Sequence, residues 1–230
     1  MQAGDFFSVR SDFSLGSFFS GEAKPWEWLP RIAEALQSLG SSSELPKGIP
    51  PGCHLSGPVF AHPSVKWPPF CTVEGPVYLD EGVEIRPGAY LRGRVIVGRG
   101  CVLGNSCEYK NCLLLDEVET AHFNYVGDSI LGNRAHLGAG VICANLKLDR
   151  GPVSVMIEGV RYATGLRKVG AFLGDGAEVG CNSVLQPGTI LGREAAVISM
   201  PFHGYLPAGM MALPTGSPVI VTRPRNGVAN

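Results

Sequence analysis

An aliphatic residue recurs at every sixth position along most of this chain. The recurring positions, all Val, Ile or Leu, are Val73, Leu79, Ile85, Leu91, Val97 and Leu103, then Leu131 and Leu137, and then Leu173, Val179, Leu185, Leu191 and Val197. A period of six fits neither an α-helix, which repeats about every 3.6 residues, nor a flat amphipathic strand, which repeats about every two. Such a period is typical of a solenoid built from short repeated units.

Each six-residue unit can supply one short strand and one corner. In many units a Gly, Asp, Glu or Arg follows the aliphatic residue and a small or medium residue comes four places on, as in Leu173-Gly-Asp-Gly-Ala. Glycine suits corners where the backbone needs a positive φ or a close approach. Three units close a triangular coil, and stacked coils bury a continuous aliphatic column. The sequence therefore predicts an all-β solenoid that resembles the left-handed parallel β-helix of hexapeptide-repeat proteins, whose crossovers have an unusual hand.

Two segments interrupt the period. Leu115 and Leu131 are sixteen residues apart, which is not a multiple of six, and we expect this phase slip to form a bulge or small loop that turns side chains outward. The repeat stops again over about residues 146–168. There Val153 to Ile157 and Val160 to Ala163 alternate on either side of a Glu-Gly pair, which predicts a projecting β-hairpin.

The predicted organisation is an N-terminal arm and helix over residues 1–56, the β-helix with its insertion over 57–213, and a C-terminal tail over 214–230. Five phenylalanines in the first twenty residues indicate an irregular arm that docks its aromatic side chains. Residues 23–39 have one apolar face and predict a helix. We expect this helix to pack on the solenoid or on a neighbouring subunit rather than to form a separate domain. Because an open solenoid end must be protected from edge pairing, the favoured position is a cap on that end.

Composition narrows the functional classes. The chain has 230 residues, of which 45% are hydrophobic and 17% charged, enough to bury a substantial core. Its formal net charge of -1 provides no general attraction to nucleic acid or acidic membranes, so neither is an expected partner. We expect Cys101 and Cys107, two of seven cysteines, to be reduced packing residues. No basic leader or bilayer-long apolar run is present, and a cytoplasmic protein is expected.

His122 is the strongest candidate for chemistry, because it lies in the phase slip and Lys110, Tyr125 and Asn145 lie within a few units of it. We expect this group to converge near one edge of the prism. A histidine titrates near neutral pH and can accept a proton from an amine or hydroxyl nucleophile. The alternative is an ordinary surface histidine, which is the interpretation we give to His54, His62 and His203.

Other polar residues give weaker signals. His122 and His136 are fourteen positions apart with no third histidine nearby, so no metal is expected. Basic residues gather in the insertion, where they are either a solvated loop or, over a cleft between subunits, receivers of phosphate. They are Lys147, Arg150, Arg161, Arg167 and Lys168.

Two stretches carry a resemblance to a known family. His122-Phe-Asn-Tyr-Val-Gly-Asp-Ser-Ile-Leu-Gly and Leu137-Gly-Ala-Gly-Val-Ile-Cys-Ala-Asn145 resemble the C-terminal acetyltransferase domain of bacterial glucosamine-1-phosphate acetyltransferase/UDP-N-acetylglucosamine pyrophosphorylase. Ala163-Thr-Gly-Leu-Arg-Lys-Val-Gly-Ala-Phe-Leu-Gly-Asp175 is similar to the related domain of archaeal-type sugar-1-phosphate nucleotidyltransferases. The resemblance covers about residues 57 to 213. It implies an acetyl-CoA-dependent N-acetyltransferase acting on an amino sugar 1-phosphate or nucleotide amino sugar, with sites between the subunits of a homotrimer.

The same resemblance implies residue roles. His122 would be the general base, Tyr125 and Asn145 would complete the catalytic group and orient the sugar, and Arg86 and Lys110 would hold the sugar phosphate. The residues that would line acetyl-CoA are Gly138, Ala139, Gly140, Cys181 and Ser199.

Two positions depart from the family pattern. His136 replaces an Asn that the family places beside the sugar, and Gly151 replaces a lysine. The missing lysine favours a second hypothesis, a non-catalytic β-helix trimer that binds a sugar nucleotide or a protein partner, or acts as a scaffold. Residues 1–56 are also too short for a nucleotide-binding α/β domain, so we expect no nucleotidyl transfer from this segment.

Overall fold

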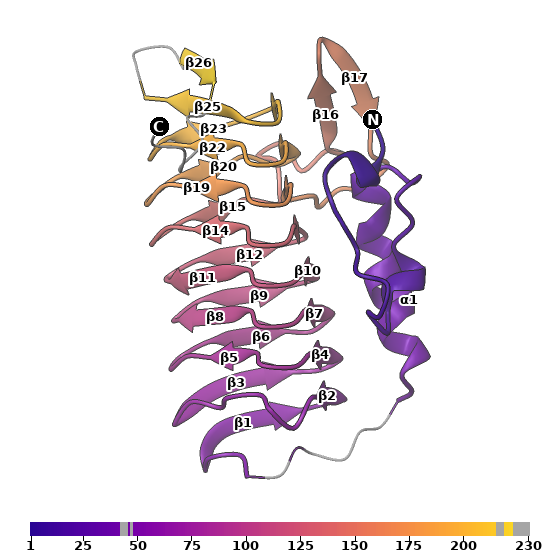
Figure 1. Ribbon diagram of the computed structural model, residues 1–230, viewed down its shortest axis with the longest axis vertical. Helices are drawn as coiled ribbons and strands as arrows, with labels where there is room; N and C mark the ends of the chain where they lie inside the picture. The colour runs from indigo at the N-terminus through magenta and orange to yellow at the C-terminus, as the bar shows by residue number, and fades with distance from the viewer. Residues whose placement is uncertain (42–45, 47, 215–218, 223–230) are drawn as a thin grey trace, which may run out of the picture.

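The structure is a computed structural model that describes residues 1–230 except 42–45, 47, 215–218 and 223–230. Its main body is a left-handed parallel β-helix, in which three sheets form the sides of a prism (Figure 1). We call these sides face 1, face 2 and face 3 in the order in which the chain enters them. The bends between them are corner 1/2, corner 2/3 and corner 3/1.

Each face contains one strand from nearly every coil. Face 1 consists of β1 Gly52–Ser56, β3 Phe70–Glu74, β6 Tyr90–Arg92, β9 Glu108–Lys110, β12 Tyr125–Gly127, β15 Ile142–Cys143, β20 Val184–Leu185 and β23 Pro201–Phe202. Face 2 consists of β2 Val59–Ala61, β4 Val77–Leu79, β7 Val95–Val97, β10 Cys112–Leu114, β13 Ile130–Leu131, β18 Ala171–Leu173, β21 Thr189–Leu191 and β24 Tyr205–Leu206. Face 3 consists of β5 Glu84–Ile85, β8 Val102–Asn105, β11 Glu119–His122, β14 His136–Leu137, β19 Glu178–Val179, β22 Ala196–Val197, β25 Met210–Leu213 and β26 Val219–Thr222, the last antiparallel to β25.

The residues that recur at every sixth position point into the interior of the prism. Every one of the thirteen recurring aliphatic residues is at most 3% exposed. They stack into one continuous core with the small residues of the corners, such as Ala135, Ala177 and Ala195. The fold predicted from the repeat is therefore confirmed.

The phase slip lies elsewhere than expected. Tyr90 pairs with Glu108, eighteen positions on, but Val95 pairs with Cys112, only seventeen on. One residue is therefore lost at corner 1/2, beside Asn111, whose φ is +49°. As a result Leu114 rather than Leu115 enters the core. A second residue is lost at the same corner one coil later, beside Asp128, because Leu114 pairs with Leu131, again only seventeen positions on. The slip therefore comes from two shortened corners, one before and one after His122. The corner that carries His122 itself is not shortened, so the expectation of a bulge there was wrong.

The insertion leaves the prism after β15 and returns at β18 without disturbing the stacking. Its two strands, β16 Ser154–Ile157 and β17 Val160–Ala163, are antiparallel. They are joined through Glu158 and Gly159, which have φ values of +50° and +81°. The predicted projecting hairpin is confirmed, and Figure 1 shows it beside the N-terminal arm.

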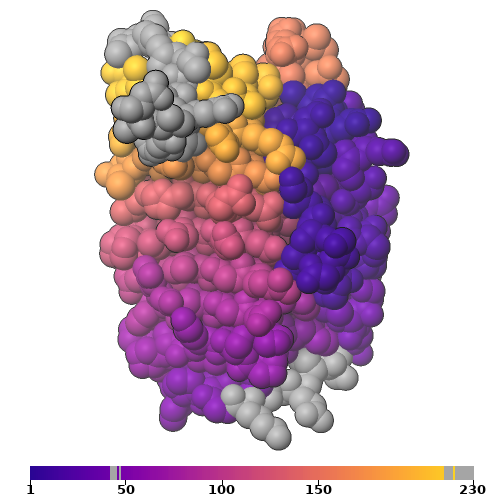
Figure 2. All heavy atoms as spheres, in the orientation of Figure 1, coloured from indigo at the N-terminus to yellow at the C-terminus, as the bar shows by residue number. Residues whose placement is uncertain are grey.

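The N-terminal arm covers a side of the prism rather than an end. It contains η1 Ala3–Asp5, η2 Gly16–Phe18, η3 Pro25–Glu27 and helix α1 Trp28–Ser38, which packs on β7 and β10 (Figures 1 and 2). The expected end cap was therefore wrong. The physical reason is an outward row of apolar side chains along face 2, which the arm buries together with its own phenylalanines. The row is Ile96, Leu113, Ile130, Phe172 and Ile190.

Three smaller points complete the fold. The first strand begins at Gly52, five residues before the start expected for the repeats. The predicted tail over 214–230 lies mostly outside the described residues. Within the part of the chain that is described, no helix combines the length and apolarity needed to cross a membrane.

Candidate active site

His122 is presented to solvent at corner 3/1. It is the last residue of β11 and is paired in register with Asn105 of the coil before. Its backbone oxygen accepts a hydrogen bond of 3.0 Å from the amide of Gly140 in the coil after. The next residue, Phe123, has a φ of +54° and is 59% exposed. An ordinary corner of the prism, rather than a register slip, therefore turns the imidazole outward.

A ridge of small residues continues from His122 along the same corner. The amide of Gly138 donates to Val179 O at 2.7 Å, and that of Gly180 donates to Val197 O at 2.7 Å. A Cβ on Gly138 would lie 2.7 Å from the amide nitrogen of Cys181, so the corners stack too closely for any other residue. All five residues predicted to line acetyl-CoA lie here. We call them the small-residue ridge: Gly138, Ala139, Gly140, Cys181 and Ser199.

Arg86 lies on the same corner, two coils before His122. The backbone amide of Arg86 donates to Leu103 O at 2.8 Å. Arg86 is therefore in register with the residues that directly follow the strands of face 3. Because neighbouring strands are about 4.8 Å apart, Arg86 and His122 differ by about 10 Å along the prism axis. The guanidinium Nε is 3.0 Å from Glu84 Oε1, and its side chain is 34% exposed. Arg86 is thus accessible from solvent but already has one carboxylate partner.

Lys110 and Asn145 meet at corner 1/2, on the opposite edge of face 1. They converge on Asp128, which is only 4% exposed. Lys110 Nζ is 3.0 Å from Asp128 Oδ2, Asn145 Nδ2 donates to the same oxygen at 2.5 Å, and Asn111 Nδ2 donates to Oδ1 at 2.8 Å. Asp128 therefore fixes three donors at once. It was missed in the sequence, although it directly follows the Tyr125-Val-Gly stretch of the matched motif.

Tyr125 connects the two corners across face 1. It is half-buried at the start of β12, and its hydroxyl accepts a hydrogen bond of 3.2 Å from Asn145 Nδ2. Burial raises the pKa of Tyr125, and the nearby charge of Glu108 raises it further. The phenol therefore stays protonated at neutral pH and is able to donate a hydrogen bond.

The predicted residues thus form two groups rather than one. His122, Arg86 and the small-residue ridge share corner 3/1, whereas Lys110 and Asn145 share corner 1/2 with Asp128. In the coils of β9 and β12, a three-residue strand of face 1 separates the two corners. The four residues expected at a single edge do not meet there, and Tyr125 spans part of the gap.

The remaining candidates stay at the surface or in the core. His54, His62 and His203 are exposed, as predicted. Cys101 and Cys107 are buried free thiols, which confirms their packing role. No group of three His, Cys, Asp or Glu side chains within the described ranges is arranged to hold a metal ion.

The basic residues of the insertion are mostly exposed. Lys147 forms an ion pair of 2.9 Å with Asp149, and Arg167 Nε donates to the backbone oxygen of Arg150 at 3.3 Å. Arg161 and Lys168 are also exposed. Among the described residues, no acidic side chain bridges two of these basic ones. The insertion therefore carries separate positive charges and not a preformed binding site for an anion.

Comparison with known proteins finds curated relatives that share part of this sequence. The chain is 36% identical over 95 residues to a bifunctional sugar-1-phosphate nucleotidylyltransferase/acetyltransferase of Sulfurisphaera tokodaii, covering 41% of this chain and 24% of that protein. It is 37% identical over 94 residues to the bifunctional protein GlmU of Methanococcus maripaludis, covering 41% and 23%. The matched region therefore spans about a quarter of the length of these curated relatives.

Solved structures with a similar course of the chain include the Arabidopsis UDP-N-acetylglucosamine acyltransferase. That structure is 13% identical to this chain, has a TM-score of 0.32, and covers 76% of this chain and 74% of its own. A family described as the GMPPB C-terminal domain matches residues 73–200, which is more than half of the chain and includes both corners described above. The chain belongs to the GMPPB C-terminal domain family.

Proposed function

We propose that the protein is an acetyl-CoA-dependent N-acetyltransferase that acts on an amino sugar 1-phosphate or a nucleotide amino sugar. One observation carries the proposal: the exposed imidazole of His122 stands at the foot of the small-residue ridge on one corner of the prism. The names of the bifunctional relatives, which include acetyltransferase, agree with this assignment.

His122 acts as the general base in this proposal. It takes a proton from the amino group of the acceptor as the nitrogen attacks the thioester carbonyl, and the CoA sulfur leaves with the electrons of the C–S bond. An imidazole suits this step because one ring nitrogen can accept a proton while the other carries one. Backbone N–H groups of the corner are the available donors to the carbonyl oxygen.

The small-residue ridge is where the chain fits a CoA arm. Ala139 and Gly140 are partly exposed and have little or no side chain, while Gly138 is buried beside them. Cys181 and Ser199 continue this surface over the next two coils. A long, narrow thioester arm needs such a smooth track with backbone hydrogen-bonding groups. When bound, acetyl-CoA supplies the activated acetyl group.

Arg86 and Lys110 are the proposed phosphate ligands, and Tyr125 and Asn145 orient the sugar. Because Lys110 and Asn145 lie one face away from His122, a single chain does not bring all of them to one substrate. We therefore propose that adjoining copies in a homotrimer complete the site, with one copy providing His122 and another the phosphate ligands.

A specific observation favours the competing function, a non-catalytic sugar-nucleotide-binding or scaffold trimer. Both cations already have carboxylate partners, since Lys110 contacts Asp128 and Arg86 contacts Glu84. A phosphate must displace or share these contacts, which weakens its binding. In the competing function the corner binds a ligand or a partner without acetyl transfer.

One assay separates the two functions. Purified protein is mixed with acetyl-CoA and either glucosamine 1-phosphate or galactosamine 1-phosphate, and release of CoA thiol is followed. The His122→Asn variant is compared with the matched His203→Asn variant, whose histidine is equally exposed on another corner. Turnover in wild type and His203→Asn with loss in His122→Asn supports the transferase. Absence of turnover in all three, together with ligand binding measured by calorimetry, supports the scaffold.

A further inference from the structure

Two cysteines face each other at the N-terminal end of the prism. Cys53 lies on β1 and Cys71 on β3, and the two are paired in register on adjacent parallel strands. Side chains in register on parallel strands point the same way, and the strands are about 4.8 Å apart. A disulfide requires a Cα separation of about 4.4–6.8 Å. The two thiols therefore occupy positions that a disulfide bridge is able to span with little movement of the backbone.

The two thiols differ in their access to solvent. Cys71 is 4% exposed, because β3 lies between β1 and β6 and its side chain packs in the core. Cys53 is half-buried, because β1 is the outermost strand of its sheet, and its Sγ donates to Pro68 O at 3.1 Å. An open pocket of about 550 Å³ reaches Cys53 from the linker side, where Pro50, His54 and Leu55 also line it. A small oxidant has a path to Cys53 but not to Cys71.

We propose that Cys53 and Cys71 form a redox-modification site, at which a low-molecular-weight disulfide converts the dithiol into a disulfide that ties the first coil to the second. The site is independent of the acetyl-transfer proposal, since it lies at the end of the prism and uses none of the residues of either corner group.

The reaction proceeds through two exchanges. The Cys53 thiolate attacks one sulfur of the oxidant, forms a mixed disulfide and releases one small thiol. The Cys71 sulfur then attacks Cys53 Sγ, loses its proton to solvent and releases the second small thiol. One disulfide is reduced for each protein disulfide formed, so atoms and electrons balance.

The order of the two steps follows from the surroundings of the thiols. Burial and the neighbouring Cys53 raise the pKa of Cys71 to about 12, so Cys71 is a poor first nucleophile. Once Cys53 carries the mixed disulfide, its sulfur is held next to Cys71, and proximity compensates for the small thiolate fraction. Cys53 is thus the entry thiol and Cys71 the resolving thiol.

The test uses the full chain with Cys181→Ser, which removes the cysteine that is exposed on the small-residue ridge. This protein is incubated with oxidised glutathione, free thiols are blocked, and the product is analysed by intact mass and peptide mapping. The expected product has lost two hydrogens and carries a Cys53–Cys71 crosslink. Amide exchange in β1 is expected to slow by on the order of a hundredfold in the oxidised form, because the closed loop restrains the opened coil.

Two further variants in the same background assign the steps. Cys71→Ala should stop at one glutathione on Cys53, and Cys53→Ala should remain unmodified. The proposal is overturned if Cys53 keeps its glutathione in the presence of Cys71, if Cys71 reacts without Cys53, or if the crosslink joins another pair of cysteines. Peptide mapping of the protein that retains both Cys53 and Cys71 shows by itself whether the crosslink forms. A folding defect in either variant therefore does not obscure the result.

Discussion

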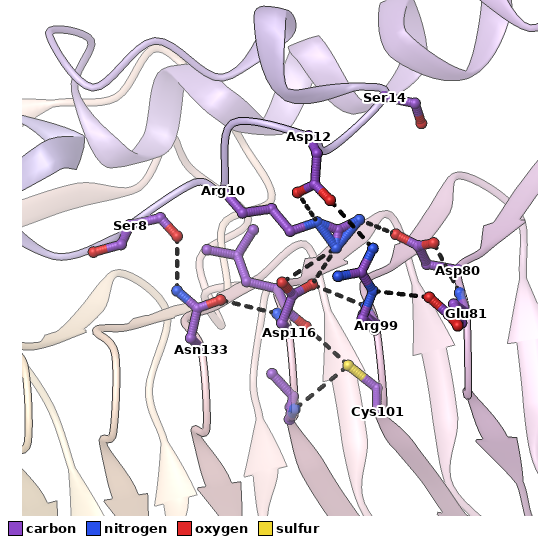
Figure 3. Close-up of polar contacts among 12 residues, drawn as sticks. Ser8, Arg10, Asp12, Ser14, Asp80, Glu81, Arg99, Cys101, Asp116 and Asn133 are labelled. Carbon is purple, nitrogen blue, oxygen red and sulfur yellow. Dashed lines mark hydrogen bonds and ion pairs between the residues drawn. The ribbon is translucent and has the colours of Figure 1, made fainter.

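Two corners of the same prism are built from the same short turns but present opposite surfaces. Corner 2/3 is covered by the chain's own N-terminal arm, where Arg10 forms ion pairs with Asp80 and Asp116 (Figure 3). Further along, Arg193 Nη1 is 2.5 Å from Asp175. Corner 3/1 carries no such cover in the described residues, and its outer surface includes the small-residue ridge, His122 and the exposed Phe123.

The two corners are also held in different ways. Corner 2/3 is secured from outside, since carboxylates at its turns accept hydrogen bonds from the arm, such as Ser8 N to Asp175 Oδ2 at 3.0 Å. Corner 3/1 is secured from inside. There Asn124, only 2% exposed, donates to Gly138 O at 2.7 Å, and the Tyr109 hydroxyl accepts from Gly104 N at 3.0 Å.

This difference explains why one corner is available for a ligand. Polar atoms in the core satisfy the backbone of corner 3/1, so no external segment is needed to stabilise it. The turn carboxylates of corner 2/3 accept hydrogen bonds from backbone N–H groups of the prism, and the arm adds further donors to them. The following changes are ordered by the size of effect expected from this contrast.

The largest effect is expected at the open corner. His122→Asn should lower the rate of acetyl transfer by about 100-fold to 10,000-fold, because a positioned general base contributes about that much. The free energy of unfolding should change little, since the imidazole is exposed and His122 joins the fold through its backbone. Steady-state kinetics and thermal unfolding measure the two quantities. An active His122→Asn variant would mean that the open corner does not perform the chemistry.

The next effect is expected at the covered corner. Arg10→Ala should lower the free energy of unfolding by about 2 kcal/mol, because it leaves the carboxylates of Asp80 and Asp116 partly buried without their cation. The figure allows for solvent screening, as the Arg10 side chain is 17% exposed. Urea unfolding measures it. Arg31→Ala is the control, since its pair with Glu34 is exposed on α1 and should contribute little. Equal free energies of unfolding for the two variants would contradict the idea that the N-terminal arm stabilises corner 2/3.

The sequence predicted the prism because one physical requirement recurs at every unit. Each coil must bury an aliphatic residue, so the period of six survives the insertion and the short corners. The position of α1 was missed, although Ile96, Leu113 and Ile130 interrupt the polar pattern of face 2. Their outward direction follows only once the inward register of the strands is known.

The site was predicted only in part for a related reason. Motif matching located His122 and the small-residue ridge, because these residues are contiguous in sequence or lie on one corner. It did not separate Lys110 and Asn145 from them, since the loss of one residue at Asn111 and the width of face 1 decide which edge each side chain reaches. Asp128 was missed because its three donors are far from it in sequence: Lys110 and Asn111 belong to the coil before, and Asn145 to the start of the insertion.

A bulky side chain on the ridge should block the open corner. Ala139→Trp is expected to raise the apparent KM for acetyl-CoA about tenfold, by occupying the surface where the CoA arm is proposed to lie. Ala139 is half-exposed, so the fold should tolerate the change. The matched control is Ala208→Trp at an exposed turn of corner 2/3, which should leave the KM unchanged. An equal rise in both variants would argue against a CoA track on corner 3/1.

The smallest effect is expected from the buried hydrogen bonds that stabilise corner 3/1. Tyr109→Phe should lower the free energy of unfolding by about 1 kcal/mol, because Gly104 N and Thr120 Oγ1 lose a buried hydrogen-bonding partner. Burial raises the pKa of Tyr109 well above its ordinary value of 10.0. The folded state therefore holds the phenol proton more tightly than the unfolded state, so this contribution is complete below pH 10 and is lost as pH rises through the folded pKa.

The stability difference between wild type and Tyr109→Phe should consequently shrink in alkaline solution. Tyr90→Phe, on the exposed side of face 1, serves as the control and should show a smaller difference at neutral pH. Urea unfolding at a series of pH values measures both variants. If the Tyr109→Phe difference stayed constant from neutral to strongly alkaline pH, the buried hydroxyl would not be what holds corner 3/1 from within.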